Sequence, residues 1–215
     1  MISGKNLGVM MEQNEFWDKR SDKYDLNIRG ENFFGPTIEK TKTLLNESDL
    51  VLDVGCATGE IGLEIANTVQ HVHGIDTSKV MIDKAKCKAV ERKIINVEFD
   101  CLDVNAQSIK RESYNKVFAF NVLHLVDNPI QAINRMSELL CENGHVVSET
   151  PCLGERGWLF RALIAVFVKV GMAPPIVGLS YRKMKQMILD NKFEIVQEEI
   201  FDDKDKVVWI VAKKV

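Results

Sequence analysis

The chain has 215 residues, of which 46% are hydrophobic and 27% charged, and this composition excludes an intrinsically disordered protein. Its 28 Lys and Arg residues against 31 Asp and Glu residues give a formal net charge of −3, which does not favour a nucleic-acid partner held by a basic surface. The N-terminal sequence has no sustained apolar run, and Arg161 and Lys169 interrupt the longest apolar stretch, residues 158–173. We therefore expect neither a signal peptide nor a transmembrane segment.

Cysteine usage indicates the cellular compartment. The five cysteines are an odd number and include no C-x-x-C pair, a pattern that supports neither a disulfide framework nor a metal site. We expect a cytoplasmic protein with free thiols and no bound metal.

From residue 50 onward, short apolar strands alternate with helices. The expected strands are 50–54, 71–76, 96–99, 116–120 and 145–148, the last after an Asn-Gly turn, and the expected helices between them are 61–69, 79–93 and 129–140. Such an alternation is typical of a parallel sheet joined by right-handed crossovers.

The C-terminal part departs from this alternation. A helix over residues 180–190, capped by Ser180, is followed by two apolar strands, 193–201 and 207–213, that are separated only by 202–206. Two strands so close in sequence pair as an antiparallel hairpin. We therefore predict one α/β domain over 1–215: a Rossmann-like, mostly parallel sheet with an antiparallel C-terminal hairpin strand and helices on both faces.

The segment VLDVGCATGE combines a strand with a glycine turn at the start of a helix. Gly55 and Gly59 let the backbone approach a ligand closely, beside the free N–H groups of a helix. The dinucleotide pattern G-x-G-x-x-G does not fit, because Ala57 and Glu60 occupy two of its glycine positions. Acidic side chains at Asp53 and Glu60 would repel a pyrophosphate but would accept a ligand with an ammonium or sulfonium centre.

Two further acids follow the next two expected strands. Asp76 can accept hydrogen bonds from the two hydroxyls of a ribose. Asp103 can accept from an adenine amino group, between the apolar side chains of Leu102 and Val104. Because the ends of parallel strands share one edge of a sheet, Asp53, Asp76 and Asp103 indicate an adenosyl ligand without a phosphate.

Together, the segments VLDVGCATG, HGIDTSKVMIDKAK, VEFDCLDV, NVLHLVDNP and ENGHVVSETP resemble the motif series of class I S-adenosylmethionine-dependent methyltransferases, of the type 11-like small-molecule kind. FWDKRSDKYD resembles the family's leading helix, so the resemblance extends from about Asn14 to the C-terminus. It implies a seven-stranded sheet whose last strand is antiparallel. It also implies S-adenosyl-L-methionine as cofactor and S-adenosyl-L-homocysteine as product.

The resemblance also implies a set of cofactor-binding residues at the strand ends and on the leading helix. They are Tyr24, Asp53, Gly55, Cys56, Ala57, Gly59, Asp76, Thr77, Met81, Asp103, Val104 and Asn121. Residues 55–59 would hold the methionine part and Asn121 would line it, Asp76 would bind the ribose, and Asp103 would bind the adenine. The chain departs from the family at Ala57, where a glycine is usual, and at Asn115, where an aspartate is common.

Several of these residues have a structural interpretation as well. Cys56 is expected to be a small buried residue rather than a nucleophile, and Met81 and Tyr24 could serve the core instead of the cofactor. His124 is the candidate catalytic base, although a core or capping role suits it equally. Glu149 could orient an acceptor. Methyl transfer can also proceed without a base, by in-line displacement between well-positioned reactants.

The crossover of residues 152–179 is longer than a connection requires, and its centre is apolar nearly all round. We expect it to cap the site together with N-terminal cap helices over 12–46. A homodimer interface and peripheral contact with a membrane, with Trp158 at the headgroups, are the alternatives. An apolar cap predicts a hydrophobic small-molecule acceptor such as a quinone, a polyketide-like ring or a lipid.

The sequence thus predicts a methyltransferase that acts on a small hydrophobic acceptor. A non-catalytic binding module with the same fold is the alternative, although the acids that a cofactor needs are all present. A nicotinamide-dependent oxidoreductase is disfavoured by the glycine spacing, the C-terminal hairpin and Glu60.

Overall fold

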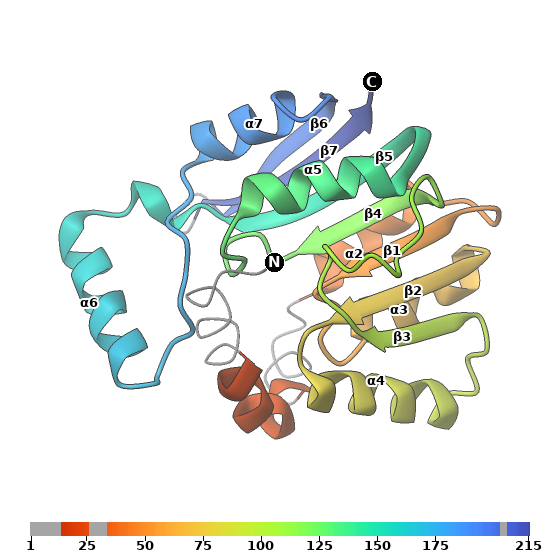
Figure 1. The fold of residues 1–215 in the computed structure, drawn as a ribbon, viewed down its shortest axis with the longest axis horizontal. Helices are drawn as coiled ribbons and strands as arrows, with labels where there is room; N and C mark the ends of the chain where they lie inside the picture. Colours follow the sequence, from red (N-terminus) through yellow and green to blue (C-terminus); the bar gives the residue numbers. More distant parts are fainter. Residues whose placement is uncertain (1–13, 26–33, 203–205) are drawn as a thin grey trace.

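The computed structural model describes residues 14–25, 34–202 and 206–215 (Figure 1). Within these ranges, a seven-stranded sheet lies between two layers of helices. The predicted cap region 12–46 and the predicted hairpin connection 202–206 lie partly outside the described residues.

The sheet has the parallel part and the antiparallel C-terminal strand that the sequence predicts. Its strands are β1 (Leu50–Val54), β2 (His71–Asp76), β3 (Val97–Cys101), β4 (Tyr114–Phe120), β5 (Leu140–Pro151), β6 (Phe193–Asp202) and β7 (Val207–Lys214). The strand order is β3-β2-β1-β4-β5-β7-β6. The pairs from β3 to β5 are parallel, whereas β7 lies between β5 and β6 and is antiparallel to both. The mostly parallel sheet with an antiparallel C-terminal hairpin strand is therefore confirmed.

Helices cover both faces of the sheet, as expected (Figure 1). They are α2 (Gly35–Lys42), α3 (Glu60–Ile65), α4 (Lys79–Glu91), α5 (Pro129–Leu139), α6 (Trp158–Lys169) and α7 (Tyr181–Leu189). Residues 14–25 are helical as well. Helices α5 and α7 lie on one face, α2 and α3 lie on the other, and α6 stands apart at the edge where the parallel strands end.

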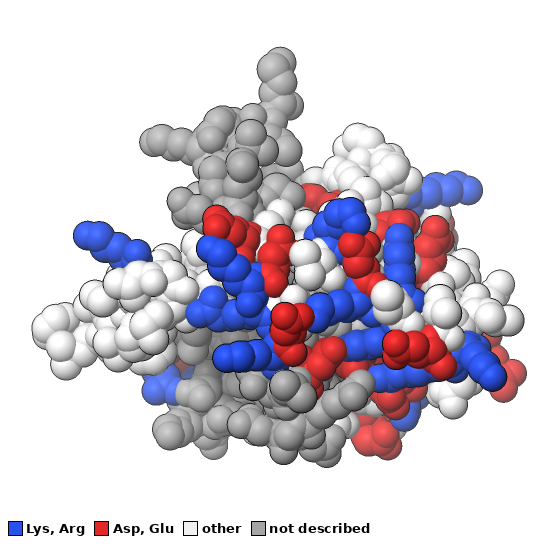
Figure 2. Space-filling model, turned by 90° about the horizontal axis from the view of Figure 1, so that it is seen from below, with Lys and Arg blue, Asp and Glu red and all other residues white. Residues whose placement is uncertain are grey.

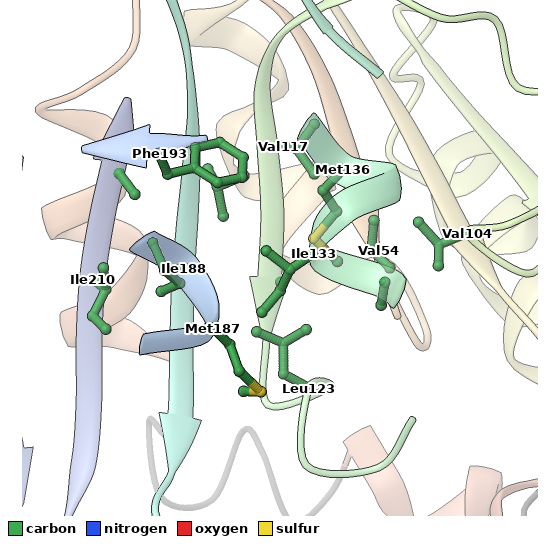
Figure 3. Packing of buried hydrophobic residues seen from close by; sticks show 14 of the residues in the cluster. Val54, Val104, Val117, Leu123, Ile133, Met136, Met187, Ile188, Phe193 and Ile210 are labelled. Carbon is green, nitrogen blue, oxygen red and sulfur yellow. The ribbon is translucent and has the colours of Figure 1, made fainter. Parts of the chain in front are cut away.

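Among the described residues, three apolar clusters hold the helices to the sheet, and two of them lie on opposite faces of β1, because alternate residues of a strand point to opposite faces. On β1, Leu52 and Val54 belong to the cluster under α5 and α7, whereas Val51 belongs to the cluster under α2 and α3. Figure 3 shows the first cluster, to which α5 contributes Ile133 and Met136. This packing fixes the end of β1, and with it the start of the glycine turn.

Some element boundaries differ from the predictions. The helix expected over 61–69 ends at Ile65 and continues as a 3-10 turn, Ala66–Thr68. The Asn-Gly pair expected as a turn before the fifth strand lies inside β5 instead. Asn143 adopts the left-handed region with φ 60°, a conformation that Asn tolerates, and the chain bulges there without leaving the strand.

The C-terminal helix begins where its cap predicts. The hydroxyl of Ser180 accepts a hydrogen bond from the backbone N–H of Lys183, and α7 starts at the next residue, Tyr181. Within the described ranges, no helix is long and apolar enough to cross a membrane.

Candidate functional site

The glycine turn between β1 and α3 forms a cradle of left-handed backbone. Gly55, Ala57 and Gly59 have φ values of 72°, 47° and 77°. A Cβ atom on Gly55 would lie 2.6 Å from a side-chain methyl of Val122, and one on Gly59 would lie 2.7 Å from the ring of Phe99. The turn therefore needs glycine at both ends, while Ala57 adopts a conformation that costs energy for a residue with a Cβ.

Asp76, at the end of β2, holds this turn in place. Its Oδ2 accepts a hydrogen bond from the N–H of Ala57 at 3.0 Å, and its Oδ1 accepts from the N–H of Ser78 at 2.8 Å. Burial raises the pKa of the Asp76 carboxyl, and these two hydrogen bonds act in the opposite direction. Each oxygen keeps acceptor capacity, so a pair of ligand hydroxyls can still bind.

Asp53, near the end of β1, is a buried carboxylate with an unused acceptor. Its side chain is 2% exposed, and Oδ2 has no hydrogen-bond partner among the described residues. Burial, together with repulsion from Asp76, raises the pKa of the Asp53 carboxyl to about 7. An unpaired buried acid beside a second acid is costly unless a ligand supplies positive charge or a donor.

The helical segment 14–25 lies against the strand ends through polar contacts. The side chains of Asn14, Asp18 and Asp25 accept hydrogen bonds from the hydroxyls of Thr77, Ser78 and Thr58, respectively, at 2.7, 2.5 and 2.6 Å. Asp25 also forms an ion pair with Lys88 of α4, at 2.7 Å. Sequence reasoning missed these contacts, because residues so far apart in the chain leave no periodic pattern.

Tyr24 of this segment reaches the site, as the resemblance implies. It lines a small cavity together with Asp53, Gly55, Cys56 and Phe120. Burial, then the charges of Asp76 and Asp53, raise the pKa of the Tyr24 phenol, which therefore stays protonated.

The residues implied for the adenine end lie beside the end of β3. The Leu102 N–H donates to the Asp76 carbonyl at 3.0 Å, which ties the ends of β2 and β3 together. Asp103 uses Oδ1 to accept from the backbone N–H and side-chain amide of Asn105, at 2.7 and 2.8 Å. Val104 and, in the first turn of α4, Met81 are buried.

Asn121 follows β4 and belongs to a cluster of hydrogen-bonded polar side chains. Only some members of this cluster could be identified from the sequence. Asn121 has a left-handed φ of 53°, and its backbone N–H donates to the Glu149 carbonyl at 2.7 Å. Its Nδ2 donates to Glu149 Oε1 at 2.9 Å, and the Thr37 hydroxyl of α2 donates to Oε2 of the same carboxylate. No motif pointed to Thr37.

Two candidates for proton chemistry are held in their neutral forms. Burial raises the pKa of the Cys56 thiol well above its ordinary value, in agreement with the expected packing role. Burial also lowers the pKa of the His124 imidazole to about 4, and its Nδ1 has no partner among the described residues. His124 is therefore a neutral and weak base at working pH.

In the described part of the chain, no cluster of three or more His, Cys, Asp or Glu side chains could hold a metal ion. The site is instead an edge of the sheet where a glycine cradle and buried acids meet. Its geometry defines an α/β nucleoside-binding protein of Rossmann-like type.

Comparison with known proteins identifies the family. Residues 45–213 match a family model described as a methyltransferase domain. The chain belongs to this family. This match and the fold confirm the resemblance to class I S-adenosylmethionine-dependent methyltransferases, the assignment to the methyltransferases, and S-adenosylmethionine as the cofactor of the class.

Individual relatives are distant. The chain is 28% identical over 141 residues to aklanonic acid methyltransferase DauC of Streptomyces sp. (strain C5), covering 63% of each protein. It is 28% identical over 156 residues to the human tRNA (uracil-5-)-methyltransferase homolog A, covering 68% of this chain and 23% of that protein. The chain thus spans less than two thirds of the length of these curated relatives.

A solved structure supports the fold. The chain aligns with the geranyl diphosphate C-methyltransferase of Streptomyces coelicolor A3(2), solved with Mg²⁺, geranyl diphosphate and S-adenosyl-L-homocysteine. The TM-score is 0.73 at 14% identity, covering 90% of this chain and 84% of the other.

Proposed function

We propose that this protein is a cytoplasmic enzyme that transfers a methyl group from S-adenosylmethionine to a small hydrophobic acceptor. The observation that carries the proposal is the buried, unpartnered Oδ2 of Asp53 beside the cradle of Gly55 and Gly59. A cationic amino-acid ligand satisfies this acid, whereas a pyrophosphate would be repelled by it.

The other site residues have matching roles in the proposal. Asp76 accepts from the ribose hydroxyls, and Asp103 accepts from the adenine amino group. Tyr24 and the segment 14–25 cover the bound cofactor and keep water from it. When bound, the cofactor supplies a sulfonium methyl group that is open to in-line displacement.

Two features support a hydrophobic small molecule as the acceptor. The apolar insertion 152–179 returns to the candidate base, where the Val177 N–H donates to the His124 carbonyl at 2.7 Å, and DauC is by name a methyltransferase of aklanonic acid. One relative acts on tRNA by name. However, Figure 2 shows Lys and Arg interspersed with Asp and Glu over the face that includes α4, an arrangement unlike a nucleic-acid surface.

Positioning of the acceptor falls to the buried group of Asn121, Glu149 and Thr37 in this proposal. The Glu149 carboxylate fixes the amide of Asn121 at the methionine end of the site. A fixed amide can orient an acceptor heteroatom without taking its proton, and orientation alone can supply a large share of the acceleration.

The test is methyl transfer from isotopically labelled S-adenosylmethionine to three acceptor classes: quinols and phenolic polyketides, polar amines, and tRNA. We expect product with the first class. Product only with amines or tRNA would contradict the hydrophobic acceptor. Cofactor binding without turnover on any class would favour the non-catalytic module instead.

His124 remains the proposed proton acceptor. Because burial lowers the pKa of its imidazole to about 4, the neutral form persists throughout the working range. The rate of methyl transfer should therefore show no loss from His124 protonation between about pH 8 and pH 5. His124→Gln should lower kcat by roughly tenfold to a hundredfold without changing cofactor affinity. An unchanged kcat in the variant would exclude His124 as the base.

A further inference from the structure

Helix α6 exposes an apolar stripe to solvent. Leu159, Leu163, Val166 and Val170 recur at helical spacing, so they share one face, and their exposed fractions lie between 50% and 66%. Trp158, at the start of the helix, is 75% exposed. None of the described side chains of α6 is fully buried, and Figure 1 shows the helix apart from the sheet.

The stretch of chain that contains the stripe carries charge of one sign. Residues 156–189 contain six Lys and Arg and no Asp or Glu, in a chain with a net charge of −3. Of these, Lys169, Arg182 and Lys183 are exposed and have no ion pair with any described residue. In Figure 2, uncharged atoms dominate the lobe where α6 lies, in contrast to the mixed charges over α4.

We propose that the exposed face of α6 docks on the surface of an anionic lipid bilayer. The aliphatic stripe would enter the boundary between headgroups and acyl chains, and Trp158 would lie at headgroup level. Lys169, at the end of α6, would meet the anionic headgroups. This surface does not depend on the proposed methyl transfer.

The one-signed charge selects this occupant over a second copy of the chain. A two-fold contact joins the same patch of both copies, and because residues 156–189 contain no Asp or Glu, this stretch offers no acid to pair with the basic side chains of the other copy. Another part of the insertion contacts the segment 14–25 instead: the Arg20 guanidinium donates to the carbonyls of Gly171 and Met172 at 3.2 and 3.3 Å. With respect to the described residues, the stripe on α6 stays exposed.

The test is co-sedimentation with two kinds of vesicle, phosphatidylcholine alone and phosphatidylcholine mixed with phosphatidylglycerol. The wild type should bind the mixed vesicles, and the fluorescence of Trp158 should shift to shorter wavelength on binding. Leu163→Glu with Val166→Glu should weaken binding by at least about tenfold. Because both side chains are exposed, this variant should fold like the wild type.

A matched control variant introduces two glutamates at exposed apolar residues outside α6. Val90 and Ile95 are 79% and 96% exposed, outside α6, so Val90→Glu with Ile95→Glu should leave vesicle binding unchanged. Lys169→Gln should weaken binding to the anionic vesicles by roughly fivefold, and added salt should weaken wild-type binding.

Three results would overturn the proposal: no binding of the folded wild type to either vesicle, equal binding to both kinds of vesicle, or unchanged binding of the Leu163→Glu, Val166→Glu variant. A dimer of the wild type in analytical ultracentrifugation that this variant abolishes, without vesicle binding, would assign the stripe to a second copy instead. Vesicle binding lost only with this variant, and not with the control, supports the bilayer.

Discussion

Replacing Asp53 with Asn is expected to stabilise the ligand-free protein relative to the wild type by an amount that grows as the pH rises from about 5 to about 7. Burial and repulsion from Asp76 raise the pKa of the Asp53 carboxyl from 3.8 to about 7. Between these values the folded state keeps a proton that the unfolded state has released. Wild-type stability therefore falls as the pH rises through this window, and Asn removes the effect.

The expected size follows from the shift. Over about two pH units within this window, from pH 5 to about 7, at about 1.4 kcal/mol each, the stability difference between variant and wild type changes by about 3 kcal/mol. Urea unfolding of both proteins at several pH values measures this difference. The control variant is Glu47→Gln, which removes an exposed carboxylate outside the site. A difference that stays constant with pH would contradict an ionisable, unpartnered Asp53.

The same variant should bind S-adenosylmethionine less tightly than the wild type does. A buried acid that destabilises the free protein and strengthens ligand binding is expected to be a ligand-binding residue.

Gly59→Ala is expected to disable the glycine cradle, with a loss of about 2–4 kcal/mol in the free energy of unfolding. The new Cβ would meet the Phe99 ring at 2.7 Å and Ala85 at 3.0 Å, at a backbone φ of 77° that favours glycine. If the chain shifts to relieve the steric clash or the backbone strain, the N-terminus of α3 moves. Cofactor affinity should therefore fall as well. Chemical unfolding and cofactor titration measure the two effects.

Two further substitutions separate the causes of this loss. Gly157→Ala should change stability by less than about 0.5 kcal/mol, because no atom lies within 4 Å of the added Cβ. In a Phe99→Leu background, Gly59→Ala should cost less, since the ring clash is removed and the backbone strain remains. An equal loss of stability in both backgrounds would show that contact with the Phe99 ring does not cause the loss.

The sheet edge that carries the site could be predicted because short, contiguous stretches of the sequence define it. β1 and β2 are short apolar runs, and Asp53 and Asp76 lie at or near their ends, so the sequence placed both acids at one edge. The glycine pair marked the turn. The parallel pairing up to β5 followed from the alternation of strands and helices, and the antiparallel pairing of β7 with β6 followed from a connection too short for a crossover.

Other features of the site depend on tertiary contacts that have no sequence pattern. Thr37 reaches Glu149 from α2, and Asn14 reaches Thr77 from the leading helix. The low pKa of His124 arises from burial, which a motif does not reveal. The all-round apolar pattern of α6 predicted burial, yet the described side chains of this helix remain at least partly exposed.

The central claim is tested most directly by isothermal titration calorimetry with S-adenosylmethionine and S-adenosylhomocysteine, on the wild type and on Asp76→Ala. Asp76 fixes the turn at Ala57 and is the proposed ribose ligand. We predict micromolar binding of both ligands by the wild type, weakened by about tenfold or more in the variant, which corresponds to about 1.4 kcal/mol. Absence of binding heat and of a thermal shift with either ligand in the folded wild type would contradict the account.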